Sequence, residues 1–188
     1  KRDNHPKIDL IALIDLISKS MDNIEKAIEV VKQGGIVIFP TDTAFGIGCK
    51  IDDERAVKRL FAIRKRPLNQ AVPVLFDSIA RVRKYVLPFG AQGKPFDSKV
   101  EQLMIDRWPG ALTIVLNCQT SKVPYLVRGG GVTIGVRIPD HEKVLQLIKG
   151  ANVPILGPSA NFHGKETPYE YEALDKRLIK LVDFVLEG

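Results

Sequence analysis

Apolar residues recur along this chain in two alternating patterns, and this alternation constrains the fold more than any other feature of the sequence. The first pattern has helical spacing and ends at Gly34–Gly35, where glycine commonly terminates a helix. Its apolar positions are Ile24, Ala27, Ile28 and Val31. The second is the continuous apolar run Ile36–Phe39, closed by Pro40, which is typical of a strand buried on both faces. The sequence therefore predicts a helix followed by a buried strand.

The same alternation continues to the end of the chain. Asp52–Asp53 offers capping residues to a second helix, and Pro67 ends it because proline disfavours a helical conformation of the preceding residue. Further helices are expected near residues 79–86, 100–104, 144–148 and 171–181. Further strands are expected near residues 45–49, 72–76, 111–116, 132–138, 153–156 and 183–186, with the glycines 129–131 in a hairpin or a wide crossover. Strands alternating with helices predict a single-domain α/β fold, with one twisted, mostly mixed sheet and flanking helices.

Composition excludes several classes of protein. With 188 residues and 45% apolar residues, the chain is long enough to bury a core without a disulfide framework. Its two cysteines, Cys49 and Cys118, have no zinc-type spacing and are expected in the core. The apolar stretch 8–17 is interrupted by Asp9 and Asp15 and is too short to cross a bilayer, so we expect neither a signal peptide nor a membrane span. The low cysteine count predicts a reducing, cytoplasmic location. The net charge of +6 is compatible with a polyanionic partner.

The densest cluster of positive charge is Arg64–Arg66. One interpretation is purely structural, because basic residues in the last turn of a helix complement its dipole. However, the apolar positions Val57, Leu60 and Phe61 continue by helical period to position 64, which places Arg64 toward the apolar face. A guanidinium that points inward needs a partner, and a bound phosphate would provide one.

Two polar loops directly follow expected strands. Thr41–Thr43 comes after the first strand, and Gly157–Asn161, which includes Ser159, comes after the strand near 153–156. Such residues favour ordinary turns, but ligands in α/β folds also bind where loops converge beyond strand ends. The sequence contains neither a phosphate-binding glycine loop nor a serine or cysteine nucleophile motif. The residues alone therefore indicate an α/β domain with a polar, positively lined pocket.

Five short motifs, in order and at the right spacing, resemble the YrdC-like family, the threonylcarbamoyl-AMP synthases. They are Gly34–Gly48, Arg64–Pro67, Trp108–Thr113, Val136–His141 and Pro158–Asn161. The similarity runs from about Asn23 onward, which divides the chain into an N-terminal extension, residues 1–22, and a YrdC-like domain, residues 23–188. The family fold has a large basic concave cavity, which the resemblance predicts for this chain.

The resemblance also implies an activity, that of a nucleotidyltransferase. ATP, L-threonine and bicarbonate would give threonylcarbamoyl-AMP and pyrophosphate, with Mg²⁺ accompanying ATP and no separate metal site. Downstream transferase proteins would then pass the threonylcarbamoyl group to the tRNA adenosine beside the anticodon. Two alternatives stay open: a non-catalytic module of the same fold that binds tRNA or double-stranded RNA, and a divergent member that acts on another carbamoyl acceptor.

Residue roles follow from the motif positions. The resemblance assigns catalysis to Arg64, Arg66, Ser159 and Asn161, and the same four residues with Thr113 to ATP binding. It assigns L-threonine to Thr41, Thr43, Arg137 and Ser159, with Asp42 and His141 as further candidates.

The chain departs from the family pattern at three points. Arg64 stands where the family has lysine, so a planar fork replaces a compact ammonium. Ala111 stands where the family has proline, which is expected only to loosen a turn. Family members also continue beyond the position of Gly188 with a segment that helps to cover the nucleotide.

Overall fold

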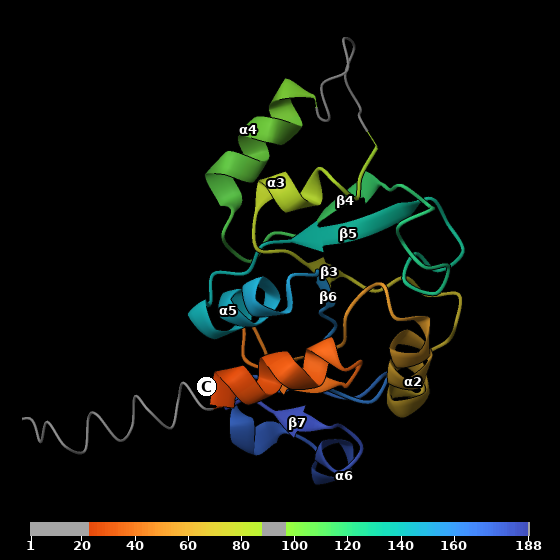
Figure 1. The fold of residues 1–188 in the computed structure, drawn as a ribbon, viewed down its shortest axis with the longest axis vertical. Helices are drawn as coiled ribbons and strands as arrows, with labels where there is room; N and C mark the ends of the chain where they lie inside the picture. Colours follow the sequence, from red (N-terminus) through yellow and green to blue (C-terminus); the bar gives the residue numbers. More distant parts are fainter. Residues whose placement is uncertain (1–22, 88–96, 188) are drawn as a thin grey trace, which may run out of the picture.

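The computed structural model describes residues 23–87 and 97–187, so the expected extension, residues 1–22, lies outside the described part (Figure 1). Residues 23–32 are helical, as predicted. The strands are β1 Val37–Phe39, β2 Gly46–Gly48, β3 Val74–Leu75, β4 Ile114–Asn117, β5 Thr133–Arg137, β6 Ile155–Leu156 and β7 Phe184–Val185. The α-helices are α2 Glu54–Arg64, α3 Ile79–Val82, α4 Ser98–Arg107, α5 Glu142–Ala151 and α6 Lys176–Ile179, and a 3₁₀ helix η2 covers Tyr171–Ala173.

The strands form two mixed sheets, in the orders β2-β1-β7 and β4-β5-β3-β6. β1 is parallel to β7 and β3 is parallel to β5, whereas the other pairs are antiparallel. β2 and β6 meet along their edges through the antiparallel bridges Gly46–Ser159 and Lys50–Ile155. The prediction of a mixed α/β architecture is confirmed, with the single expected sheet divided into two that join at this seam.

Close backbone contact at the seam depends on a glycine. A Cβ atom added at Gly48 would lie 1.9 Å from the carbonyl oxygen of Leu156, so no larger residue fits without moving a strand. Cys49 O accepts the Leu156 N–H at 2.9 Å, which fixes the register of the two edges. The seam therefore places the loop after β6 beside the start of β2.

Local signals explain the ends of α2. The Asp53 side chain accepts from the N–H groups of Arg55 and Ala56, which makes it the N-cap. The helix ends at Arg64 because Lys65 adopts a left-handed conformation, with φ 53°. Pro67 follows two residues later, as the sequence predicted. The buried face of α2 continues through Arg64, which confirms the helical phase expected for that residue.

The helices lie at different ends of the molecule (Figure 1). α3 and α4 flank β4 and β5, whereas α6 lies near β7 at the opposite end. α5 packs against the helix of residues 23–32, where a Cβ at Gly150 would lie 2.3 Å from the Cδ1 atom of Ile28. Cys49 and Cys118 are both buried in the apolar core, as expected. Among the described residues, no helix is long and apolar enough to cross a membrane.

Two expected helices differ in the structure. The helix expected over 79–86 is shorter in the structure, where α3 ends at Val82. Beyond a turn, Val86 forms a β-bridge with Cys118, which the helical conformation would not allow. The helix expected over 171–181 is divided into η2 and α6, because Leu174 is extended, with ψ 129°, and Asp175 then caps α6. The connection that contains glycines 129–131 joins the antiparallel pair β4–β5, so it is a wide hairpin loop rather than a crossover.

Candidate nucleotide and threonine site

Arg64 is a buried cation, only 3% exposed, at the end of α2. Its Nε donates to the backbone oxygen of Asn161 at 3.0 Å, and its Nη2 donates to Asn161 Oδ1 at 2.9 Å. Its Nη1 is also buried, but no acceptor in the described part of the chain pairs with it. A buried guanidinium nitrogen without an acceptor is costly, and an anion that reached it would supply the missing partner.

The electrostatic surroundings of Arg64 point in the same direction. Burial lowers the pKa of Arg64 from 12.5 to about 10, and the nearby cation of Arg66 lowers it further in the same sense. The guanidinium is still charged at neutral pH, and its charged form is unfavourable in this position. A bound oxyanion would relieve that cost by supplying the missing charge partner.

The loop after β6 holds Ser159 and Asn161 beside Arg64. The seam with β2 fixes this loop, because Ala160 N donates to Phe45 O at 2.8 Å and Ser159 pairs with Gly46. Ser159 Oγ donates to Asn161 Oδ1 at 2.8 Å. Asn161 Oδ1 therefore accepts from both Ser159 and Arg64, so the structure joins three residues that the sequence predicted to share a site.

Arg66 has a different environment. It is half-buried, and burial lowers its pKa. Its Nε donates to Gln70 O at 3.1 Å and its Nη2 donates to Ala71 O at 2.5 Å, so it braces the loop that leads into β3. Its assigned contact with phosphate stays a prediction.

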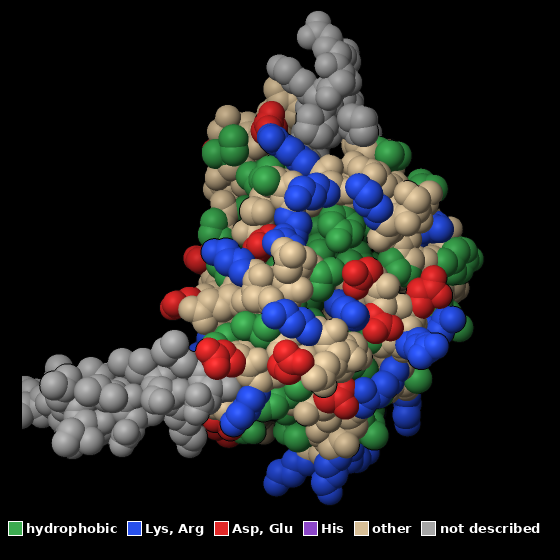
Figure 2. All heavy atoms as spheres, in the orientation of Figure 1, with side chains coloured by type: hydrophobic (Ala, Val, Ile, Leu, Met, Phe, Trp, Pro, Cys, Tyr) green, Lys and Arg blue, Asp and Glu red, His purple; other side chains and the backbone are tan. Residues whose placement is uncertain are grey.

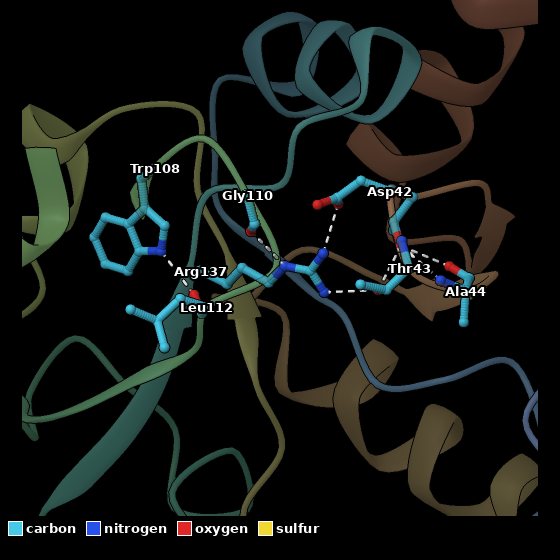
Figure 3. A network of polar contacts seen from close by, with 8 residues as sticks. Asp42, Thr43, Ala44, Trp108, Gly110, Leu112 and Arg137 are labelled. Atoms are coloured by element: carbon cyan, nitrogen blue, oxygen red, sulfur yellow. Dashed lines mark hydrogen bonds and ion pairs between the residues drawn. The ribbon is translucent and has the colours of Figure 1, made fainter. Parts of the chain in front are cut away.

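The loop between β1 and β2 is ordered by its own side chains. Thr41 Oγ1 donates to Ala44 O at 2.6 Å and contacts Thr43 Oγ1 at 3.2 Å. Arg137 reaches this loop from β5, with Nη1 at 2.9 Å from Thr43 Oγ1 and Nη2 at 2.5 Å from Asp42 Oδ1 (Figure 3). The structure therefore brings together the four residues Thr41, Asp42, Thr43 and Arg137.

The remaining candidates lie around β5. Thr113 is exposed and immediately precedes β4, whose first residue, Ile114, pairs with Val136 next to Arg137. His141 occupies the N-cap position of α5 without a side-chain capping hydrogen bond, and its Nδ1 is buried without a partner among the described residues. Burial, with Lys143 next in importance, lowers the pKa of His141. Trp108 is buried and donates from Nε1 to Leu112 O at 2.7 Å, so it packs in the core and its one polar group is satisfied (Figure 3).

Sequence reasoning missed two backbone groups that hold the site. Gly110 O accepts from Arg137 Nε at 2.9 Å, and Lys165 O accepts from the side-chain nitrogen of Asn161 at 2.5 Å. Gly110 lies within the Trp108–Thr113 motif, so the motif could have pointed to it as part of the site. Nothing in the sequence marks the carbonyl of Lys165. The basic cavity implied by the resemblance stays a prediction.

Charge and metal-binding groups complete the description. Figure 2 shows Lys and Arg side chains spread over one face among Asp and Glu side chains, rather than a region of a single sign. In the ranges 23–87 and 97–187, no group of three or more His, Cys, Asp or Glu side chains could hold a metal ion.

Comparison with known proteins gives consistent similarities. A sequence model of the Sua5/YciO/YrdC family, described as "telomere recombination", matches residues 29–188. A threonylcarbamoyl-AMP synthase of Bacillus subtilis is 31% identical over 92% of this chain, and one of Vibrio cholerae is 30% identical over 89%. The chain spans 49% of the Bacillus protein and 86% of the Vibrio protein. The crystal structure of Pyrococcus abyssi Sua5 complexed with L-threonine has a TM-score of 0.80 and 32% identity, over 88% of this chain and 46% of Sua5.

Proposed function

The chain belongs to the Sua5/YciO/YrdC family, and on that premise we propose that it is a threonylcarbamoyl-AMP synthase, a nucleotidyltransferase. ATP, L-threonine and bicarbonate would give L-threonylcarbamoyl-AMP, pyrophosphate and water. Relatives that carry this name and the threonine complex of Sua5 support the proposal.

The structural observation that carries the proposal is the buried Nη1 of Arg64, which has no hydrogen-bond partner among the described residues. A buried guanidinium that serves only to end a helix would have all its buried nitrogens paired within the protein. Here the two nitrogens bonded to Asn161 fix the orientation of the fork, and the third is buried with no partner among the described residues, so a phosphate oxygen would pair with it once the atoms that cover it move. Ser159 adds a hydroxyl beside this position. The arrangement suits a triphosphate, which needs directed donors and positive charge.

The chemistry requires positioning rather than a covalent intermediate with the protein. The unprotonated amino group of threonine adds to the carbon of bicarbonate and water leaves, which gives a carbamate. A carbamate oxygen attacks the α-phosphorus of ATP, the bond to the bridging oxygen breaks, and pyrophosphate leaves. Negative charge increases on the α,β-bridging oxygen and the pyrophosphate, where fixed cations lower the barrier.

We assign the residues accordingly. Arg64, Arg66, Ser159 and Asn161 hold the triphosphate, with Thr113 at the nucleotide. Thr41, Thr43 and Ser159 face threonine. Mg²⁺ enters as the ion bound to ATP and neutralises part of its charge. For Arg66 to reach phosphate, its guanidinium must release the carbonyl of Gln70 or Ala71.

The product is a reactive mixed anhydride, so a group-transfer reaction must consume it. We propose that partner proteins transfer its threonylcarbamoyl group to tRNA in the cytoplasm. RNA binding without catalysis rests on the net charge of +6 and on the basic cavity that the resemblance implies, and the mixed charges in Figure 2 do not favour it over the synthase.

Release of pyrophosphate from ATP tests the proposed function. We expect release that depends on both L-threonine and bicarbonate and that falls at least about 100-fold in Arg66→Ala, as it does when a donor to developing charge is lost. Arg81→Gln is a matched control, because Arg81 pairs with Asp77 at 2.7 Å outside the assigned residues, and it should retain activity. Release that does not require threonine would refute the synthase assignment.

A further inference from the structure

All three nitrogens of the Arg137 guanidinium are used within the protein. Nε donates to Gly110 O at 2.9 Å, Nη1 to Thr43 Oγ1 at 2.9 Å and Nη2 to Asp42 Oδ1 at 2.5 Å (Figure 3). The side chains of Arg137 and Asp42 are 12% and 16% exposed. These contacts use three of the five N–H groups of the guanidinium, one on each nitrogen, and they hold its plane toward the Thr41–Ala44 loop.

The contacts of the loop form a hydrogen-bond chain with one direction. Arginine can only donate, so Thr43 Oγ1 accepts from Arg137. Thr41 donates its hydroxyl proton to Ala44 O, so in its contact with Thr43 it accepts and Thr43 donates. The series of hydrogen bonds thus runs from Arg137 through Thr43 and Thr41 to the carbonyl of Ala44. Bonds aligned in this way strengthen one another, and Arg137 stands at their head.

Arg137 also connects the two sheets. β5 and β1 are separated by β3, β6 and β2 in the joined strand order, which corresponds to about 19 Å in a flat layer at about 4.8 Å per strand. An extended arginine side chain spans only about 7 Å. The contact therefore requires the loop after β1 to fold toward β5, and the ion pair with Asp42 holds it there.

We propose that Arg137 is a positioning residue for threonine: it holds the Thr41–Ala44 loop against β5, and this loop, not the guanidinium, contacts the amino acid. The inference rests on the proposed synthase function and replaces the direct contact that the family resemblance implied. It also predicts that Arg137, the first donor in this series of hydrogen bonds, and its acceptor Thr43 affect threonine affinity together rather than independently.

Binding of two ligands by the full chain distinguishes the roles. L-threoninol keeps the amino group and the β-hydroxyl of L-threonine but lacks its carboxylate. In Arg137→Gln, the Kd values for both ligands should rise by a similar factor, about tenfold, because the loop that contacts them is released. A rise for L-threonine alone would show direct carboxylate binding and would overturn the proposal. Arg137→Lys should recover part of the affinity, since an ammonium can still pair with Asp42.

Coupling between Arg137 and Thr43 gives a second test. Thr43→Val removes the hydroxyl with little change in shape. In the double variant Arg137→Gln, Thr43→Val, the loss of threonine affinity should not exceed that of the more severe single variant. If the factors by which the two single variants reduce threonine affinity multiply in the double variant, Arg137 and Thr43 do not act through the same series of hydrogen bonds.

Amide hydrogen exchange tests the tether independently of any ligand. The N–H groups of Thr43 and Ala44 both lie 3.2 Å from Thr41 Oγ1. Their exchange should become about tenfold faster in Arg137→Gln but stay unchanged in the control Arg81→Gln. Unchanged exchange in Arg137→Gln would show that Arg137 does not hold the Thr41–Ala44 loop and would overturn the proposal. If exchange does become faster but the wild-type chain does not bind threonine, only the proposed function is refuted.

Discussion

Replacing Arg64 with methionine keeps an unbranched side chain but removes the guanidinium. The variant loses two hydrogen bonds to Asn161, which together contribute about 3 kcal/mol at the lower value for bonds to charged groups. It also removes an unfavourable buried charge. The lowering of the Arg64 pKa from 12.5 to about 10 corresponds to about 3 kcal/mol. Since these effects oppose each other, the free energy of unfolding should change by no more than about 1 kcal/mol.

Ligand binding should respond very differently. ATP at about 100 times its Kd stabilises a protein by about 2.7 kcal/mol. In a domain of this size that raises Tm by roughly 5–10 °C. Arg64→Met should lose most of this increase, because the unpaired Nη1 is the group that we propose receives phosphate.

Thermal unfolding with and without Mg²⁺–ATP measures both quantities in one assay. We expect the ligand-free variant to melt within about 4 °C of the wild type and to show little increase with ATP. The contrary pattern, a large loss of Tm without ligand but a full increase with ATP, would mean that Arg64 is structural and would refute the reasoning.

The remaining predictions concern Asn161, Gly48 and Cys49. Asn161→Ala removes the Oδ1 acceptor of the buried Arg64 Nη2 and keeps only the backbone oxygen that pairs with Nε, so it should lower both Tm and ATP affinity, the latter at least about tenfold by calorimetry. Gly48→Ala places a Cβ 1.9 Å from Leu156 O and should cost about 3 kcal/mol or more in denaturant unfolding. Burial, and to a smaller extent the negative charge of Asp53, raises the pKa of Cys49 to about 12. A thiolate-specific reagent at pH 8 should therefore label Cys49 only after unfolding. Because the unfolded thiol ionises near 9.0 and the folded one near 12, its contribution to stability should be lost as pH rises between these values.

Each of these predictions has an outcome that contradicts it. Gly164→Ala is the control for Gly48, because nothing lies within 4 Å of a Cβ at Gly164, where φ is +75° and only backbone strain of about 1 kcal/mol is expected. Equal costs for the two glycines would argue against a tight seam. Asn161→Ala with unchanged ATP affinity would separate Asn161 from the phosphate site. Rapid labelling of Cys49 in the native protein would show that the seam opens readily.

Local patterns were enough to predict much of this fold. Helical period alone placed Arg64 on the buried face, and Asp53 and Pro67 marked the limits of its helix. The same rules failed over 171–181, where apolar spacing suggested one helix. There the capping preference of Asp175 outweighed periodicity and started a new helix.

The contacts that create the site could not be predicted from local pattern. Arg64 and Asn161 are 97 positions apart, and Arg137 and Asp42 are 95 apart. Their meeting depends on the order of the strands and on the seam between β2 and β6, which short-range preferences do not encode. Resemblance to a family could identify the residues, but only the fold shows which of them already have partners.

Formation of the activated carbamate itself tests the central claim most directly. The chain would be incubated with Mg²⁺–ATP, L-threonine and ¹³C-labelled bicarbonate, and the products analysed by mass spectrometry. A synthase should give threonylcarbamoyl-AMP one mass unit heavier than with unlabelled bicarbonate, together with pyrophosphate. Pyrophosphate without a labelled adenylate, or hydrolysis of ATP to ADP and phosphate, would contradict the account.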